Sequence, residues 1–477
     1  MVDIKLSSES TNTPAFKKDV VSKKKMSSYS MGVFIDSFFT EAFGFLVLYY
    51  YEVELGLVIL LVGLSFVIFA VWNMINDPLV GFLTDRPFKW SKKYGMRTPW
   101  VVFGVIGTVI CFYFLFAVPD FGDVKSNPWP LFWYMVIITC LFDLFYSIFY
   151  ANYYGAFANI FRTTDQRRRA STITFLIGIL GRTLLGAVLI PMFIVYGDAS
   201  TFRTFALVSC VVLLIALAIL LPGIHENEFV KKRYFQVFEF IESQKLPYFK
   251  VLKITFKQRN FVVSTAALTL WIMAQILTVS SFLFFIRYVL REDIAALGIL
   301  TLGFLAIIPA ILIFSATTAK KIEHSNQFAL GMVIMGFGFG SILFATSSFH
   351  LFLSLAIVGV GMGAATCVLF SVIGDTQDEV CLAAGRHLEA TLAGIRTFFV
   401  RISYISVGVI ITGVHLATGF VPGSEQQTDL ALLGIRLHTS VFSAVFCWIA
   451  AFMLFKFYNL KGEKREAQMA ALRKRGL

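Results

Sequence analysis

Charged residues are scarce in this chain: Asp, Glu, Lys and Arg make up 15% of its 477 residues, whereas soluble globular domains carry about 25%. Hydrophobic residues make up 57%, and the mean hydropathy is +0.77. This balance excludes a water-soluble enzyme. An apolar bilayer span needs about 20 residues, so twelve spans would occupy half of the chain. We therefore expect one polytopic membrane protein.

Cysteine is also scarce, and none of the six cysteines belongs to a Cys-x-x-Cys pair. All but Cys381 lie inside apolar segments, which indicates small hydrophobic side chains and excludes a disulfide framework. The six histidines lack metal-ligand spacing, and no Ser/His/Asp or Cys/His grouping is evident. The sequence therefore predicts a protein that is not an enzyme and that needs no cofactor beyond a coupling ion, H⁺ or Na⁺.

Twelve apolar runs follow one another along the chain. Lipid admits only helices or closed barrels, and these runs are too long and too uniformly apolar for barrel strands. The expected fold is therefore all-α, an integral membrane protein with twelve transmembrane helices. The runs lie near residues 31–51, 56–84, 100–118, 131–151, 171–196, 203–221, 262–286, 294–318, 328–346, 350–373, 391–418 and 437–459.

Basic residues predict the orientation of these spans. Most of the 41 Lys and Arg residues fall in alternate connecting segments, including both ends of the chain. By the positive-inside rule, both termini then lie in the cytoplasm, which requires an even number of spans. The net charge of +12 is explained by basic loops against an anionic inner leaflet. We expect contact with the lipid bilayer of the cell membrane, a monomer, and no nucleic-acid partner.

The longest basic segment divides the spans into six and six, which is the plan of a two-lobed transporter. The glycine strings Gly331 to Gly340 and Gly359 to Gly363 do not follow soluble strands, so they predict close helix packing. The expected domains are a cytoplasmic tail at 1–30, an N-terminal lobe at 31–221, a central loop at 222–261, a C-terminal lobe at 262–460 and a tail at 461–477.

Four stretches of the chain carry motifs of one family, and the Trp-x-x-Ile-Asn-Asp-Pro-x-x-Gly string from Trp72 to Gly81 is the most specific. On these motifs the chain resembles the glycoside–pentoside–hexuronide:cation symporters, the melibiose-permease-like family of the major facilitator superfamily. The resemblance implies a twelve-helix symporter that works by alternating access. The other stretches are Tyr49 to Leu57, Asp85 to Trp100, and Gly374 to Glu389.

The resemblance implies a cation site on the second helix, where the family has Asp-x-x-x-Asp. This chain has Asn73-x-x-x-Asp77, and residues four apart share one face of a helix. A carboxylate at bilayer depth is usually functional, although a structural hydrogen bond is the alternative. Since one carboxylate is replaced by an amide, the sequence favours H⁺ over Na⁺ at Asp77, with Na⁺ as the only expected metal ion.

Charged residues also interrupt other spans, and they are not expected all to face lipid. A polar cavity between the lobes would accommodate Asp36, Glu41, Asp143 and Arg182. Arg401 occupies the place of a family lysine, so the resemblance implies that it couples the lobes, with Asp143 as a further coupling residue. The alternative for both arginines is a structural ion pair.

The family's galactoside-binding carboxylates are not retained, since their places fall on Ser37 and Tyr150. Aromatic rings with hydroxyl groups can stack on a sugar and hydrogen-bond its edge. Packing aromatics are the alternative in a chain with 52 Phe. The candidate substrate-binding residues are Asp36, Ser37, Tyr150, Tyr154 and Arg182.

Charges near the inner ends of helices are candidates for gating. Asp85, Arg86 and Arg97 resemble the superfamily's loop after the second helix, although topology would also explain the arginines. Asp375 and Asp378, near the end of the tenth span, match the family motif better than they match a metal cluster. We expect these five residues to form gates on the cytoplasmic side.

The sequence thus predicts a cation-coupled symporter for a small polar solute, a sugar or glycoside. An alternative on the same fold is a transporter of a lysolipid or another amphipathic anion, because the lining is rich in Phe and has lost the sugar carboxylates. A more remote alternative is a non-transporting receptor, against which stands the lack of a sizeable soluble output domain.

Overall fold

The computed structural model describes residues 21–84, 91–161, 164–226, 248–317, 322–385 and 388–475. All regular secondary structure in these segments is helical, and twelve helices or continuous helical chains are long and apolar enough to cross a membrane. Six of them lie between Lys23 and Ile224 and six between Arg259 and Phe457. The predicted all-α fold with twelve spans is confirmed, while the cytoplasmic location of the termini stays a prediction.

The helices of the first half run from Lys23 to Ile224. The first begins at Lys23, inside the segment expected as a tail, because Ser22 caps it by accepting a hydrogen bond from the Lys25 backbone at 3.2 Å. The helices are α1 (Lys23–Tyr49), α2 (Ile59–Thr84), α3 (Ser91–Tyr94), α4 (Thr98–Phe116), α5 (Trp129–Ile160), α6 (Thr164–Thr183), α7 (Ile190–Phe193) and α8 (Ala199–Ile224).

The second half includes helices outside the expected spans: α10 lies within the segment expected as the central loop, and α21 lies in the C-terminal tail. The helices are α10 (Tyr248–Lys257), α11 (Arg259–Phe284), α12 (Ala296–Gly303), α13 (Ile307–Thr317), α14 (His324–Ser341), α15 (Ser348–Ala384), α16 (Glu389–Arg401), α17 (Ser403–Ser406), α18 (Thr412–Thr418), α19 (Asp429–Arg436), α20 (Phe442–Phe457) and α21 (Glu463–Arg475).

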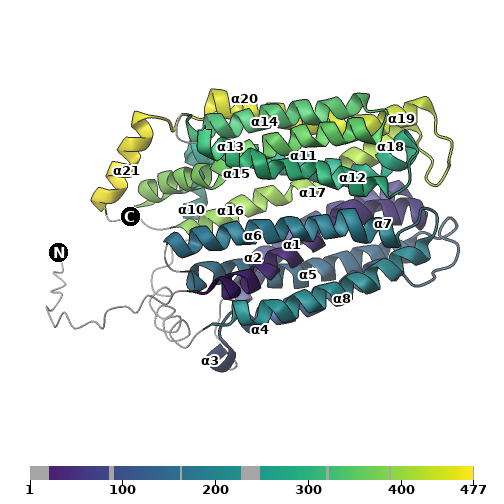
Figure 1. The fold of residues 1–477 in the computed structure, drawn as a ribbon, viewed down its shortest axis with the longest axis horizontal. Coiled ribbons are helices and arrows are strands. Elements are labelled where there is room, and N and C mark those ends of the chain that lie inside the picture. Colours follow the sequence, from purple (N-terminus) through teal and green to yellow (C-terminus); the bar gives the residue numbers. More distant parts are fainter. Residues whose placement is uncertain are drawn as a thin grey trace.

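Two groups of helices lie side by side (Figure 1). The purple-to-teal helices α1 to α8 form one group, and the green-to-yellow helices α11 to α20 form the other. The start of α1 and the end of α20 lie at the same end of the bundle, as an even number of spans requires. We call the opposite end, with the connections 117–128 and 419–428, the distal end.

Short π-helical segments interrupt five of the described spans, each in the part of the span nearer the distal end. Such segments insert an extra residue into a helical turn and are frequent at functional sites. They are η1 (Tyr50–Glu54), η2 (Leu184–Leu189), η3 (Phe285–Leu290), η6 (Val407–Ile411) and η7 (Leu437–Val441). Two 3-10 segments, η4 (Phe304–Ala306) and η5 (Ile342–Phe344), complete the helical structure of the described residues.

Glycines let several of these helices approach closely. A Cβ added at Gly331 of α14 would lie 2.7 Å from the Gly361 carbonyl oxygen of α15, and one added at Gly361 would lie 2.6 Å from the Met335 backbone nitrogen. The glycine strings therefore serve helix packing, as the sequence predicts. In the first half, a Cβ at Gly104 of α4 would lie 2.5 Å from the Phe149 backbone nitrogen of α5.

We expect Gly104→Ala to destabilise the protein by about 1–3 kcal/mol, because a methyl group there must push α4 away from the backbone of α5. The melting temperature in detergent measures the effect. Gly413→Ala on α18 is the matched control, since nothing lies within 4 Å of a Cβ there. Equal melting temperatures for both variants would contradict the packing argument.

Candidate functional site

An ion pair joins the two halves of the bundle at Asp77 on α2. Its Oδ2 accepts a hydrogen bond from Nε of Arg401, at the end of α16, at 2.8 Å. Its Oδ1 accepts a hydrogen bond from Oγ of Ser147, on α5, at 2.7 Å. The side chains of Arg401 and Asp77 are 11% and 22% exposed. Asp77, expected as the cation site, and Arg401, expected as the coupling residue, therefore meet across the interface between the halves.

A second carboxylate lies beside this pair, and it is more deeply buried. Asp143 Oδ1 accepts a hydrogen bond from Asn73 Nδ2 at 2.6 Å, and its Oδ2 accepts one from Asn76 Nδ2 at 3.1 Å. All three side chains are buried. Where the family has a carboxylate on α2, this chain has Asn73, and the Asp143 carboxylate of α5 is hydrogen-bonded to it. Sequence reasoning missed Asn76 and Ser147, although Asn76 is part of the Ile-Asn-Asp-Pro string.

The two asparagines present unsatisfied acceptors. Asn73 Oδ1 and Asn76 Oδ1 are buried, and neither has a hydrogen-bond partner among the described residues. Leaving such an atom unpaired costs about 1–3 kcal/mol. Close by is a cavity of about 20 Å³, enough for one water-sized occupant. Its polar lining consists of Thr40, Asn73, Asp143, Tyr146, Arg401 and Tyr404.

No group of three or more His, Cys, Asp or Glu side chains in the described segments is arranged to hold a metal ion. A cation near Asp143 would therefore depend on one or two carboxylates supplemented by amide and hydroxyl oxygens. Such neutral oxygens are ordinary ligands of hard cations.

The predicted substrate residues separate into two places, and the first is a tyrosine cluster around Asp36 of α1. Tyr146 donates a hydrogen bond to Asp36 Oδ1, and Tyr154 donates one to Oδ2 at 2.7 Å. The ring of Tyr150 lies 4.5 Å from that of Tyr154, centroid to centroid. Asp36, Tyr150 and Tyr154 are thus brought together, with both carboxylate oxygens of Asp36 already bonded.

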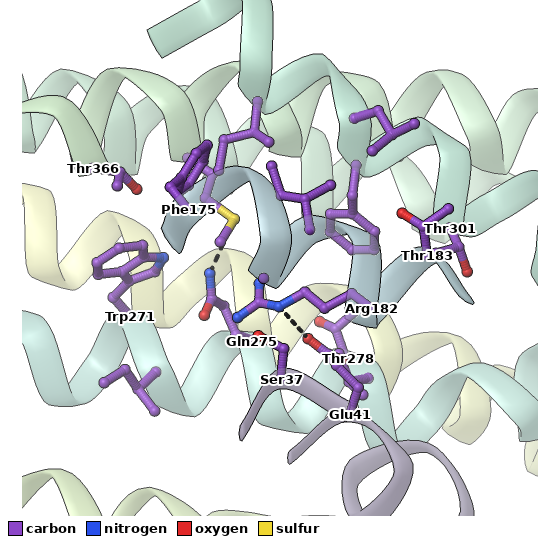
Figure 2. A pocket seen from close by; sticks show the side chains of 18 of the residues that line it. Ser37, Glu41, Phe175, Arg182, Thr183, Trp271, Gln275, Thr278, Thr301 and Thr366 are labelled. Atoms are coloured by element: carbon purple, nitrogen blue, oxygen red, sulfur yellow. Dashed lines mark hydrogen bonds and ion pairs between the residues drawn. The ribbon is translucent and has the colours of Figure 1, made fainter. Parts of the chain in front are cut away.

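The second place is a cavity of about 410 Å³ between the halves, and Ser37 and Arg182 line it (Figure 2). Arg182 Nε, on α6, lies 3.3 Å from Glu41 Oε1 of α1. Gln275 donates a hydrogen bond to the Met362 sulfur at 3.3 Å. Apolar side chains, such as Val33, Phe45, Phe175, Ile179, Leu268 and Phe339, form much of the remaining wall.

The gating candidates that can be located hold parts of their own half together. Arg97 donates a hydrogen bond to Asn152 Oδ1 of α5 at 3.1 Å. Asp375 Oδ2 lies 3.0 Å from Nε of Arg465 in α21 and 3.4 Å from Nδ1 of His324. Asp378 lies three residues further along α15, and Asp85 and Arg86 fall outside the described residues.

Sequence comparison identifies the family. The model of the MFS/sugar transport protein family matches residues 28–462, which is most of the chain. The chain belongs to this family. It is therefore a multi-pass membrane protein of a transporter family, and the predicted resemblance to major facilitator symporters is confirmed.

Similar proteins carry different cargoes. The chain is 23% identical to the sodium-dependent lysophosphatidylcholine symporter 1-A of Danio rerio, with 86% of this chain and 79% of the relative covered. It is 21% identical to the isoprimeverose transporter of Lactiplantibacillus pentosus, with 88% and 85% covered. The inward-open xylose transporter of E. coli shares the fold, with a TM-score of 0.57, 13% identity and coverage of 94% and 98%.

We expect Arg401→Ala to lower stability by about 2 kcal/mol or more, because it leaves Asp77 largely buried without its counter-charge. Arg401→Lys should recover part of the loss, since a point charge remains. The double variant Arg401→Ala/Asp77→Asn should be more stable than Arg401→Ala alone. Thermal unfolding measures all three, with Arg203→Ala, at an exposed position of α8, as control. Additive effects would contradict direct pairing.

Proposed function

We propose that this protein is a cation-coupled symporter that carries an amphipathic solute between its two halves by alternating access. The ion pair between Asp77 and Arg401 supports cation coupling, since it spans the halves and lies beside the buried carboxylate of Asp143. The observation that carries the cargo proposal is the inter-lobe cavity, whose wall is mostly apolar with one ion pair, Arg182 and Glu41.

We propose that the coupling cation binds next to Asp77 and Asp143, in competition with the Arg401 guanidinium. A cation there would neutralise carboxylate charge and weaken the tie between the halves. Two observations favour Na⁺ over the H⁺ that the sequence suggests. The two carboxylates supply the negative charge that Na⁺ needs, and the unpaired amide oxygens of Asn73 and Asn76 are suitable ligands. A proton on a carboxylate would leave at least one of these oxygens unsatisfied.

The cavity favours an amphipathic cargo over a free sugar. A sugar carries hydroxyl groups around its edge, and each needs a polar partner when it leaves water. The wall offers a polar pole at Arg182 and Glu41, while the apolar side chains around it suit an alkyl or aryl group. The lysophosphatidylcholine symporter among the relatives supports this proposal.

A glycoside with an apolar aglycone is the second candidate. Trp271 lines the cavity, and its indole N–H is buried with no hydrogen-bond partner among the described residues. An indole ring can stack on the apolar face of a sugar while its N–H binds a hydroxyl group. The isoprimeverose transporter among the relatives supports this candidate.

We expect Na⁺ to raise the melting temperature of the purified protein at constant ionic strength, with choline as the reference cation. Asn73→Asp should amplify this effect, because a carboxylate at that position would repel Asp143 without Na⁺ and bind Na⁺ with it. Asn127→Asp, in an exposed connection, is the control. An unchanged Na⁺ response in Asn73→Asp and in Asp143→Asn would contradict a Na⁺ site here.

We expect proteoliposomes to accumulate labelled lysophosphatidylcholine when an inward Na⁺ gradient is imposed. Arg182→Ala should reduce uptake about tenfold or more by removing the cationic pole of the cavity, whereas Arg203→Ala should not. Uptake of a labelled glycoside instead would support the second candidate. Uptake driven by a pH gradient alone would contradict Na⁺ coupling and support H⁺, and no uptake of either solute under any gradient would contradict the proposed symport.

A further inference from the structure

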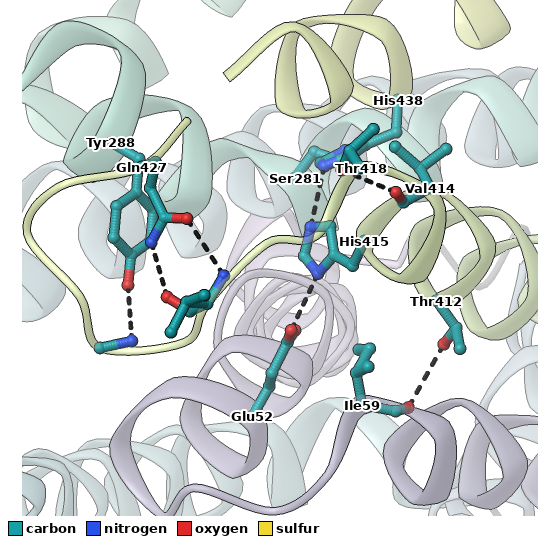
Figure 3. Close-up of polar contacts among 12 residues, drawn as sticks. Glu52, Ile59, Ser281, Tyr288, Thr412, Val414, His415, Thr418, Gln427 and His438 are labelled. Atoms are coloured by element: carbon teal, nitrogen blue, oxygen red, sulfur yellow. Dashed lines mark hydrogen bonds and ion pairs between the residues drawn. The ribbon is translucent and has the colours of Figure 1, made fainter. Parts of the chain in front are cut away.

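A buried chain of polar side chains joins the halves at the distal end (Figure 3). Glu52 Oε1, in η1, lies 2.8 Å from His415 Nδ1, in α18. His415 Nε2 lies 3.2 Å from His438 Nε2, in η7, and His438 Nδ1 lies 2.7 Å from Ser281 Oγ, in α11. All four side chains are at most 2% exposed. None of them takes part in the candidate cation site or the large cavity.

The number of hydrogens available to these hydrogen-bonded side chains indicates how many protons the group holds. Ser281 Oγ lies 2.7 Å from the Leu277 carbonyl oxygen, and when its single hydroxyl hydrogen is donated there it accepts from His438. Three contacts remain, from Glu52 to His415, from His415 to His438 and from His438 to Ser281, and each needs one hydrogen. Two neutral imidazoles supply two hydrogens. In that arrangement the third is a proton bound by the Glu52 carboxyl or by one of the imidazoles.

The net charge of these four side chains also favours one additional proton. With the third proton the group is neutral overall, either as a carboxylic acid with two neutral imidazoles or as a carboxylate with one imidazolium. Without it, a net negative charge remains among buried side chains, which is costly. Glu52 Oε2 is buried and has no hydrogen-bond partner among the described residues, so nothing described here compensates that oxygen.

Neighbouring charged groups have partners of their own. Arg287 lies 3.1 Å from Glu54 and also donates to the Tyr49 hydroxyl. The Tyr288 hydroxyl accepts from the Gly423 backbone, and Arg436 donates to the carbonyl oxygens of Leu343 and Ala345. Asp429 is exposed at the start of α19. Two aromatic rings lie against the His415 ring, Phe420 at 4.3 Å and Phe284 at 5.1 Å between centroids.

We propose that Glu52, His415 and His438 form a proton-binding site that holds the two halves together at the distal end. One proton makes this group neutral when this end is closed, and its loss leaves a net negative charge buried between elements of opposite halves. Because opening exposes the same groups to water, the unprotonated form is stabilised in the open state. The ratio of closed to open molecules should then fall up to tenfold for each unit of rising pH, the slope for one linked proton.

Distances between spin labels on the two halves test the proposal without cargo or a cation gradient. Lys125→Cys and Gln426→Cys place labels at exposed positions in distal connections of the first and second halves. Cys140 and Cys367, which are not fully buried, are first changed to Ala. Between about pH 5 and about pH 9, the short distance should give way to a longer one. A distance distribution that does not change over this range would overturn the proposal.

Glu52→Gln separates the proton site from a merely structural contact. A Gln amide donates to His415 Nδ1, so the chain is complete with two neutral imidazoles and needs no added proton. This variant should stay closed across the whole pH range.

His350→Gln, at the start of α15 and outside the buried hydrogen-bonded group, should follow the pH dependence of the unmodified protein. If Glu52→Gln opens with rising pH as the unmodified protein does, the site does not bind the controlling proton. Because the readout needs neither transport nor Na⁺, its failure is distinct from failure of the proposed function.

Discussion

The cost of burying charge in a lipid-embedded bundle determines how the halves of this protein meet. A carboxylate at bilayer depth needs an opposite charge or several donors. Asp77 finds them in Arg401 from the other half and in Ser147 from its own. Since one partner comes from each half, the halves cannot part at this level unless something replaces the guanidinium. A cation bound as proposed would be such a replacement, and its binding would link ion occupancy to the arrangement of the halves.

The sequence predicts most of the fold because lipid leaves few choices for a long apolar segment. It also identifies Asp77, whose motif is local. It does not reveal the contacts of Asp143, because the pairing of α2 with α5 joins residues about 70 positions apart. Glu52 and His415 are separated by 363 positions, and no spacing rule relates them. The buried histidine pair therefore appears only when the helices are assembled.

The separation of the predicted substrate residues has a simple geometric cause. Neighbouring residues on a helix point about 100° apart. Accordingly Asp36 turns toward Tyr146 and Tyr154, while Ser37 faces the large cavity. The sequence-based prediction places both residues at one substrate site, whereas the fold assigns them to different surroundings. The tyrosine cluster satisfies its carboxylate internally, which leaves the cavity as the better candidate for cargo.

The π-helical segments contribute to the distal contacts in a specific way. Glu52 lies in η1 and His438 lies in η7, so two members of the buried proton chain come from widened helical turns. An extra residue in a turn changes the direction of the side chains that follow. The orientations of Glu52 and His438 in this buried group therefore depend on the irregular turns.

The ion pair in the large cavity differs from the one at Asp77, because Arg182 and Glu41 both belong to the first half. It therefore does not tie the halves together. A cargo held by its charged group at this pair would reach the second half through its remaining surface, against residues such as Trp271 and Gln275. In that case the cargo, and not the ion pair, contacts both halves. A ligand changes a conformational equilibrium only by binding one state better than another. A solute that bridges this cavity has that difference in affinity, because its second contact surface moves away when the halves rearrange.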